Sequence, residues 1–218
     1  MFKAAIGLML AALVCGCVST KTVAVDDAVT REFQGKTITS TRRAIPDFAA
    51  TTAGKASFGL IGATAMISAG NRIVRENKVE DPADYMSSRL VAELAQKHGL
   101  TVLDNTGKRV SDEAPEMIAK LHADAHYVLD VRTVNWGFSY FPTDWNSYAV
   151  SLGSKLRVID ASNGKVMAEA YCFRMPEKTD SAPSHDELLA NQAQRLKEEL
   201  RNLADYCMRE FKANALKL

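Results

Sequence analysis

The sequence carries almost no net charge, and this absence excludes one group of partners. Its 218 residues include 27 Lys and Arg against 26 Asp and Glu, which gives a formal net charge of +1. Domains that bind nucleic acid, or that charge holds on anionic lipid, carry a clear basic excess. We therefore expect no nucleic-acid partner and no membrane attachment through charge.

Motifs of enzymes and metal sites are also missing. Gly54-Lys55 is followed by Ala56 rather than Ser or Thr, and Ala49 stands where a phosphate-binding loop needs its first glycine. The sequence contains no G-x-S-x-G elbow and no Cys/His spacing of the zinc type. It therefore predicts no enzyme, no metal ion and no cofactor.

The 4 histidines do not form a ligand pattern either. His122 and His126 have the spacing of two ligands on one helix face, but only a continuous helix brings such a pair together. Asp124-Ala125 between them is expected to turn from helix to strand, which separates the two rings. His98 and His185 lie next to expected helix ends, where imidazole commonly interacts with terminal groups.

The apolar run at the start of the chain is too short to span a bilayer. Lys3 is followed by the uncharged, largely apolar residues 4–14, whereas a spanning helix needs roughly 20 apolar residues. A positive charge, a short apolar run and small residues after it are typical of a secretory signal peptide. We expect residues 1–16 to be such a peptide and the remainder to be exported.

The end of this segment, Leu13-Val14-Cys15-Gly16-Cys17, resembles the lipobox of bacterial lipoproteins. Val14 and Cys15 depart from the leucine and the small residue that are usual in that family. The resemblance implies that Cys17 is a lipidated first residue, carrying palmitate-type chains, and that residues 17–35 form the lipidated N-terminus and tether. Val18 stands in place of the aspartate that the family associates with inner-membrane retention, so we expect an outer-membrane anchor facing the periplasm. The alternative is an ordinary signal peptide with an incidental cysteine.

Apolar periodicity predicts an α+β fold for residues 36–218. Strands are expected at 36–42, 100–103, 126–134, 148–159 and 166–173, the second of them short and buried. Helices are expected from Asp81-Pro82 to Gly99, from Ser111, and, long and C-terminal, from Ser184. We therefore predict a single domain with a mainly antiparallel sheet of about four to five strands, packed by helices.

Local signals mark several of these boundaries. Asp81 is placed to cap a helix that has Pro82 in its first turn, and Ser184-His185-Asp186-Glu187 matches a capping box. Ser162-Asn163-Gly164 predicts a hairpin, since Asn-Gly supplies the positive φ angles of tight turns. On the helix from Ser111, the residues expected on the apolar side are Met117, Ile118 and Leu121.

The remaining cysteines, Cys172 and Cys207, are expected to form a disulfide. Cys172 has the apolar parity of the last strand. Cys207 lies on the apolar stripe of the last helix, which also contains Leu189, Ala193, Leu196, Leu200 and Leu203. If the helix packs on that face of the strand, the two thiols meet, and an exported protein encounters oxidising conditions. The alternative is a pair of buried free thiols.

Residues 136–148 are rich in aromatic side chains and contain both tryptophans of the chain. Pro142 interrupts a regular ladder, so we expect a turn between two strands. One interpretation is a loop folded over a minor core, with Trp136 and Tyr148 as cross-strand partners. The other is a contact surface for a protein partner, formed by Trp136, Phe138, Tyr140, Phe141, Trp145 and Tyr148.

The segment 49–74 is apolar and rich in small residues, and residues 56–71 carry no charge between Lys55 and Arg72. On a helix, its larger side chains would lie nearly all round, and its small residues would allow close backbone approach. One interpretation is a helix buried within the domain. The other is a self-associating or membrane-contacting element.

Three further stretches carry a family resemblance. They are the helix end at 92–99, Ala123-Asp124-Ala125-His126-Tyr127-Val128-Leu129, and the hairpin at 156–166. Over residues 83–170 they look like the periplasmic αβ module of envelope lipoproteins such as CsgG and LpoB and of the TolB N-terminal domain. The resemblance implies a non-catalytic adaptor or assembly module.

The leading interpretation is therefore a membrane-anchored envelope lipoprotein that binds a protein partner. The second is a subunit of a homo-oligomeric secretion or pore-type assembly that uses residues 56–71. An envelope enzyme of unknown type is third, because active sites are assembled by folding and not by sequence proximity.

Overall fold

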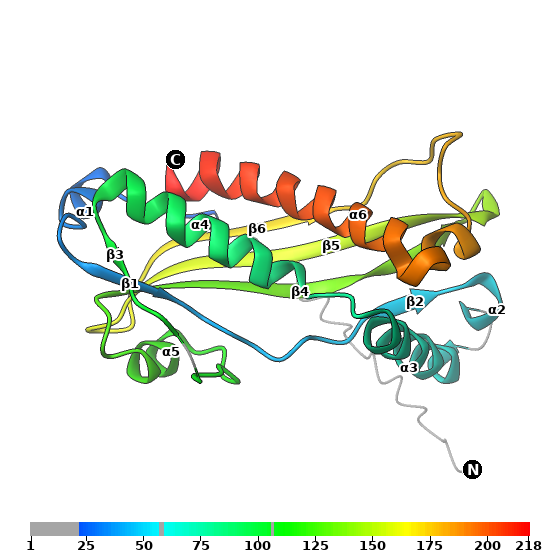
Figure 1. The fold of residues 1–218 in the computed structure, drawn as a ribbon, viewed down its shortest axis with the longest axis horizontal. Helices are drawn as coiled ribbons and strands as arrows, with labels where there is room; N and C mark the ends of the chain where they lie inside the picture. Colours follow the sequence, from blue (N-terminus) through cyan, green and yellow to red (C-terminus); the bar gives the residue numbers. More distant parts are fainter. Residues whose placement is uncertain (1–21, 57–58, 106) are drawn as a thin grey trace, which may run out of the picture.

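The computed structural model describes residues 22–56, 59–105 and 107–218. The expected signal peptide and the expected lipidation site Cys17 lie outside the described residues. In chain order the elements are α1 (Asp27–Arg31), β1 (Thr37–Ser40), β2 (Ala49–Thr51), α2 (Ala53–Ala56), α3 (Gly59–Asn77), α4 (Pro82–His98), β3 (Thr101–Val102), α5 (Pro115–Leu121), β4 (Tyr127–Phe141), β5 (Asp144–Asp160), β6 (Val166–Arg174), α6 (His185–Phe211) and a π-helical segment, η1 (Lys212–Leu216). They form the predicted α+β fold with a long C-terminal helix (Figure 1).

The sheet is mixed, which corrects the expectation of a smaller, mainly antiparallel sheet. Within the described residues its 6 strands follow the order β3-β1-β4-β5-β6, and β2 also pairs with β4. β4, β5 and β6 are antiparallel neighbours, whereas β1 pairs in parallel with both β3 and β4. β1 and β2 lie one after the other along β4, because Thr39 pairs with Val128 and Ala50 with Phe138.

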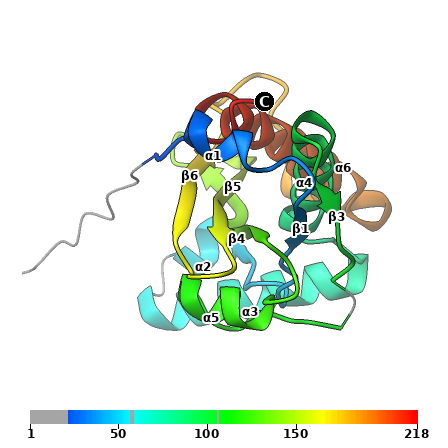
Figure 2. The same cartoon turned by 90° about the vertical axis from the view of Figure 1, so that its left-hand side faces the viewer.

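Helices cover the two faces of the sheet unequally. α4 and α6 lie side by side on one face and α5 lies on the other (Figure 1, Figure 2), whereas α3 packs beside β2 and contributes Val74 to the core under α4 and α6. The large core lies under α4 and α6 and includes Leu90, Leu94, Leu129, Leu152, Leu156, Leu196 and Leu200. A much smaller cluster lies under α5, where Ile118 packs with Val128 and Ile159. Because hydrophobic stabilisation grows with the apolar area removed from water, the α4–α6 layer supplies most of it.

β4 continues through the segment that the sequence assigns to a turn. A bulge at Val134 interrupts its register with β5, and Val134 is 44% exposed. Before the bulge, odd-numbered residues such as Leu129 face the large core, and after it even-numbered residues such as Trp136 and Phe138 do so. The expected loop is therefore a long hairpin arm, and only Pro142-Thr143 separates β4 from β5.

Most of the predicted boundaries are confirmed. The Asp81 carboxylate accepts from the Ala83 N–H at 2.9 Å to cap α4, and Gly99 ends the helix in the left-handed region, with φ 67°. Ser184 and Glu187 form the capping box of α6. Gly164, with φ 74°, closes the β5–β6 turn. The sequence did not predict that α6 is interrupted at residues 190–193 by non-helical backbone angles.

Two expectations on the helix and strand near the sheet edge are corrected. β3 was expected to be buried, but Thr101 and Val102 are both exposed, because β3 is an edge strand of only 2 residues. α5 begins at Pro115 rather than Ser111. Its residues Met117 and Leu121 are 49% and 40% exposed, since the helix is short and turns only Ile118 and Ala119 into the protein.

The N-terminal part of the described chain belongs to the domain, which corrects the expected tether boundary at residue 35. Val23 exchanges two backbone hydrogen bonds with Glu169 of β6, at 2.7 and 2.9 Å. Val25 and Phe33 are buried in the large core, on either side of α1. Residues from Val23 onward are thus packed against the sheet and the C-terminal segment.

Candidate functional site

The aromatic residues of the candidate partner surface are divided between the core and the surface. Trp136, Phe138, Phe141 and Tyr148 are all buried, at 8% exposure or less, whereas Trp145 is 65% exposed. Tyr140, half-buried, pairs across the strands with Tyr148, so the expected Trp136–Tyr148 partnership is replaced. The expected surface is corrected to Trp145 with part of Tyr140, because the bulge turns Trp136 and Phe138 into the core and Phe141 and Tyr148 are buried as well.

The buried rings form a continuous aromatic cluster at this end of the large core. Phe48, just before β2, meets Trp136 edge-on with ring centroids 4.9 Å apart, and Phe138 contacts both Phe48 and Tyr148. The indole N–H of Trp136 donates to the Pro46 carbonyl at 3.1 Å. The hairpin arm is therefore anchored in the core along most of its length.

The hairpin tip, residues 140–148, holds Trp145 on a rigid support. Asp144 accepts from the Ser147 hydroxyl at 2.7 Å and pairs with Lys178 at 3.2 Å. The hydrogen bond from Ser147 and the charge of Lys178 contribute to lowering the pKa of Asp144, so the turn stays charged and closed at neutral pH. The ring of Tyr140 meets Trp145 edge-on at 6.4 Å between centroids.

A second segment fastens the tip from the side. The Tyr148 N–H donates to the Pro183 carbonyl at 2.8 Å, and Ser147 forms a β-bridge with Ser184. The ring of His185, at the start of α6, packs edge-on against Tyr148 with centroids 5.7 Å apart. The loop 175–184 and the first turn of α6 therefore fix where Trp145 stands.

A cavity of about 210 Å³ lies beside the hairpin tip. Its apolar wall includes Phe141, Val150, Pro176 and Pro183, and α6 contributes Arg195 and Glu199, which pair at 2.8 Å. Glu177, Thr179 and Ser181 also line it, so the hollow combines apolar and polar walls and could take one side chain of a binding partner. Trp145 and this cavity together form the candidate site.

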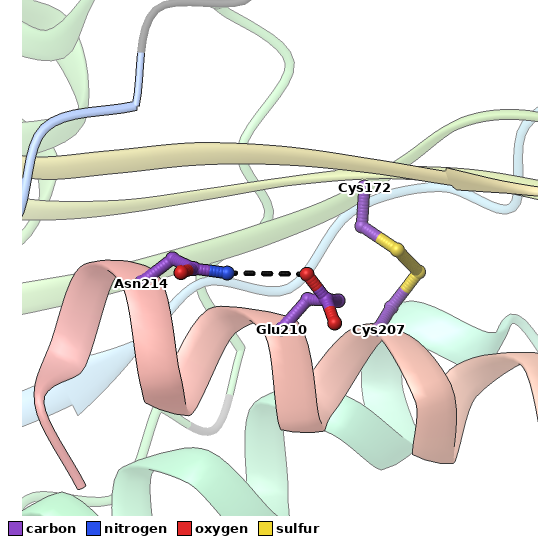
Figure 3. The surroundings of a disulfide bond; sticks show 4 residues. All are labelled: Cys172, Cys207, Glu210 and Asn214. Atoms are coloured by element: carbon purple, nitrogen blue, oxygen red, sulfur yellow. Dashed lines mark hydrogen bonds between the residues drawn. A yellow bond between two sulfur atoms is a disulfide. The ribbon is translucent and has the colours of Figure 1, made fainter.

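Cys172 of β6 and Cys207 of α6 are joined in the disulfide that the sequence predicts (Figure 3). Their Cα atoms are 5.5 Å apart, and both residues are buried in the large core. One turn further along, the Asn214 amide donates to the Glu210 carboxylate at 3.1 Å. The disulfide links residues with a sequence separation of 35. In the chain-entropy model a cross-link of this span stabilises the folded state by about 3–4 kcal/mol.

Within the segment 56–71, Ala56 ends α2 and the residues from Gly59 onward belong to α3; from Ile61 to Asn71 the burial of the side chains is uneven. Ile61 is 80% exposed and Ala63 and Ala65 are exposed too, which corrects the interpretation of a helix buried along its whole length. Close packing begins at Gly70, where a Cβ atom would lie 1.9 Å from the Phe48 carbonyl oxygen. In the described part of the chain, no helix combines the length and apolar character needed to cross a membrane.

An ionic cluster that sequence reasoning missed lies on the α5 face of the sheet. The Asp130 carboxylate accepts from Arg43 Nη2 at 2.9 Å, from Arg157 Nη2 at 2.7 Å and from the Thr41 hydroxyl at 2.8 Å. The side chain of Asp130 is 1% exposed. Burial raises the pKa of this carboxyl, but the two guanidinium charges and the hydrogen bonds outweigh burial and hold the pKa below its ordinary value.

The outer donors of this cluster are also satisfied. Arg43 Nη1 donates to the Asp112 carbonyl at 3.1 Å, and Arg157 Nη1 donates to the Glu113 carbonyl at 2.9 Å. The cluster therefore ties the loop before α5 to β4 and β5. With its hydrogen bonds directed into the protein, it serves the fold rather than a ligand.

The histidines lie apart in the structure. His122 is 1% exposed, and burial lowers its pKa, so it is neutral at neutral pH. His126 is exposed, with Nδ1 2.7 Å from the Thr37 hydroxyl. His98 packs edge-on against Phe33 at 5.5 Å. Among the described residues, no group of three His, Cys, Asp or Glu side chains is placed to hold a metal ion.

No family model and no curated protein matches the chain. Solved structures with a similar fold include the hypothetical protein CT253 from Chlamydia trachomatis (11% identity, 82% of this chain and 95% of the other, TM-score 0.40). A second is the PelC dodecamer from Paraburkholderia phytofirmans (16% identity, 85% of this chain and 96% of the other, TM-score 0.32). A third is lipoprotein GNA1162 from Neisseria meningitidis (12% identity, 67% of this chain and 86% of the other, TM-score 0.29). These scores and identities assign neither a family nor a function to the chain.

Proposed function

We propose that the protein is an outer-membrane lipoprotein whose domain binds a protein partner at the hairpin tip and catalyses no reaction. Trp145 carries this proposal, because it is 65% exposed while the turn beneath it is held by hydrogen bonds and an ion pair. A large aromatic side chain on a rigid support loses little entropy on binding. A few exposed aromatic residues of this kind often supply most of the affinity of a protein interface.

Photo-cross-linking in intact cells tests the partner site. A photoreactive amino acid at Asn146, an exposed neighbour of Trp145, should give an adduct with a different envelope protein. Trp145→Ala should reduce that adduct strongly, since loss of an interface hot spot of about 2 kcal/mol weakens binding roughly 30-fold. Phe173→Ala is the matched control, because Phe173 is 50% exposed on β6, away from the tip.

The outcomes separate the proposal from its rivals. A heterologous adduct that Trp145→Ala removes and Phe173→Ala preserves supports the hairpin tip. An adduct that survives Trp145→Ala contradicts it. A ladder made only of this chain supports self-association instead.

The anchor is tested separately, because Cys17 lies outside the described residues. The lipobox resemblance implies that Cys17→Ser abolishes incorporation of labelled palmitate and moves the protein from the outer-membrane fraction to the soluble fraction. The folded domain should keep its thermal stability, since the substitution leaves the packed residues from Val23 onward unchanged. Undiminished palmitate labelling of Cys17→Ser would overturn the anchor.

A homo-oligomeric assembly is the second candidate, and the exposed side chain of Ile61, near the start of α3, favours it. Ile61 lies in a helical stretch without charge and is 80% exposed. If copies of the chain meet there, Ile61→Asp should abolish a homo-oligomeric cross-linked ladder in intact cells. Met117→Asp is the control, because Met117 is a similarly exposed apolar residue on α5.

A further inference from the structure

A second cavity, of about 290 Å³, lies between α4 and α6. Its lining consists of the corner Lys78–Asp81 between α3 and α4, Pro82 and Tyr85 of α4, and Lys197, Leu200, Arg201 and Ala204 of α6. With 3.6 residues per turn, these α6 residues lie on the opposite side of the helix from Arg195 and Glu199 beside the hairpin tip. The two cavities are therefore separate sites.

The charges around this cavity are mainly positive. Lys78, Lys197 and Arg201 line it, and none of them has an ion-pair partner among the residues that the structure describes. The Asp81 carboxylate is already engaged by the Ala83 N–H and the Thr133 hydroxyl. This leaves Glu80 as the one acidic group of the lining that is exposed to solvent.

Arg201 is fixed in a position that leaves its N–H groups available. Its guanidinium carbon lies 3.5 Å from the ring centre of Tyr85, a cation–π contact that uses the face of the guanidinium. The Tyr85 hydroxyl donates to Asp205 at 2.8 Å, which holds the ring in place. A stacked guanidinium presents its N–H donors at its edge, in a planar fork that matches the oxygens of carboxylate and phosphate.

Lys78 occupies a backbone position that favours glycine. Its φ angle is 53°, and it directly follows Asn77, the last residue of α3, where a left-handed residue commonly closes a helix. Left-handed backbone is strained for any residue with a Cβ atom. Lys78 nevertheless lines the cavity and brings an ammonium group that glycine would lack.

We propose that the cavity between Lys78 and Arg201 binds a small oxyanion group, a carboxylate or a phosphate. Lys78, Lys197 and Arg201 line one hollow, and the guanidinium of Arg201 is stacked on the ring of Tyr85. The volume suits a compact head group and is below that of a typical drug-sized ligand pocket. The site stands independently of the hairpin tip.

Equilibrium dialysis of the purified full chain tests this site with two probes, radiolabelled inorganic phosphate and radiolabelled succinate. Saturable binding of either probe is expected, weakening as NaCl is raised because the attraction is between charges. Competition between the probes then distinguishes phosphate from carboxylate as the preferred anion. Absence of saturable binding of both probes at 10 mM, a concentration of about 10 times a millimolar Kd, overturns the proposal.

Variants locate the binding within the cavity. Arg201→Ala should weaken binding at least tenfold. Arg209→Ala should leave it unchanged, because Arg209 lies on the same helix over Tyr206 at 5.8 Å but outside the cavity. An equal loss in both variants overturns the assignment.

The Lys78→Gly variant separates a binding role of Lys78 from a structural role, because anion binding and thermal stability are expected to respond differently. Glycine adopts left-handed backbone angles without strain, so the melting temperature of the variant should rise or stay the same. Anion binding should nevertheless fall at least threefold, because an ammonium group is lost. Unchanged binding in a folded Lys78→Gly variant contradicts the role of this lysine in the site.

Discussion

The two faces of the sheet are stabilised by different means. Under α4 and α6 the contacts are apolar, and a disulfide joins the outer strand to the helix layer. Under α5 the apolar cluster is small, and the Arg43–Asp130–Arg157 ionic cluster joins the loop before α5 to the sheet. Burial of apolar area needs no particular partner, whereas a buried charge depends on each of its partners. The α5 face should therefore be the more sensitive to a single substitution and to pH.

The largest expected effect is on the α5 face. Asp130→Asn leaves the buried Arg157 and the half-buried Arg43 without a counter-charge, which should lower the free energy of unfolding by about 3–5 kcal/mol. Urea unfolding followed by circular dichroism measures the loss. Asp124→Asn is the control, since its pair with Lys108 has a carboxylate that is 57% exposed, and such surface pairs contribute little to stability. Equal losses would contradict the difference between the faces.

The next largest effect is expected on the face that α4 and α6 cover. Replacing both cysteines, in a Cys172→Ser, Cys207→Ser variant, should lower the free energy of unfolding by about 3 kcal/mol, because the unfolded chain is no longer cross-linked. Reduction of the unaltered protein with dithiothreitol should give a similar loss. A reductant that changes nothing, together with two thiols titrated in the untreated protein, would show that the cysteines are free.

Acid should weaken the α5 face in two steps. His122 has a pKa lowered by burial, so the unfolded state takes up a proton at this residue as pH falls below about 6.5, while the folded state resists it. The folded pKa of Asp130 is also lowered, so its contribution is present above the unfolded value of about 3.9 and is lost as pH falls through the folded value.

Unfolding free energies measured at a series of pH values test both signs. Stability should fall from pH 7 to pH 5, and His122→Gln should flatten that part of the curve. The steeper fall below pH 4 should be flatter in Asp130→Asn. Stability that rises on acidification would contradict both assignments.

The smallest effect is expected for the apolar cluster under α5. It tests whether packing and charge contribute independently to the stability of that face. Ile118→Val removes one methylene from the cluster under α5 and should cost about 1 kcal/mol, measured by thermal unfolding. It should not change the pH dependence, since no charged group is touched. A change in the acid slope would mean that the apolar cluster and the ionic cluster are coupled.

The parts of the fold that sequence reasoning predicted are those set by neighbouring residues. Asp81 and Gly99 bound α4, Ser184 caps α6, and Gly164 turns the last hairpin, because each acts on backbone groups a few residues away. The pairing of Cys172 with Cys207 was also predictable, since both lie at apolar positions of amphipathic elements.

The parts of the fold that sequence reasoning missed depend on partners far away in the sequence or on a break in the periodicity of a strand. The bulge at Val134 exchanges the parity of β4, so the alternation before it gives the wrong face for Trp136 and Phe138. The charge of Asp130 is matched by Arg43, which is 87 residues away in sequence. Neither strand pattern nor spacing indicates that partner.

The candidate site shows the same division. The many aromatic residues of 136–148 indicate the correct hairpin, but the sequence does not show which of these rings are buried. Trp145 is exposed because it follows the turn at Pro142-Thr143, and the loop 175–184 supports the tip without covering it. Only the three-dimensional arrangement reduces the predicted surface to Trp145 and part of Tyr140.

The disulfide also decides how the domain responds to mechanical load. Val23 joins the N-terminal part of the chain to β6 at Glu169, so a pull on that end enters the molecule through the outer strand. A short distance along the same strand, Cys172 is bound covalently to Cys207 of α6. Under tension the two hydrogen bonds of Val23 yield first, while β6 and the C-terminal helix are held together as one body. A protein tethered at its N-terminus would thus lose its first contacts before its sheet opens.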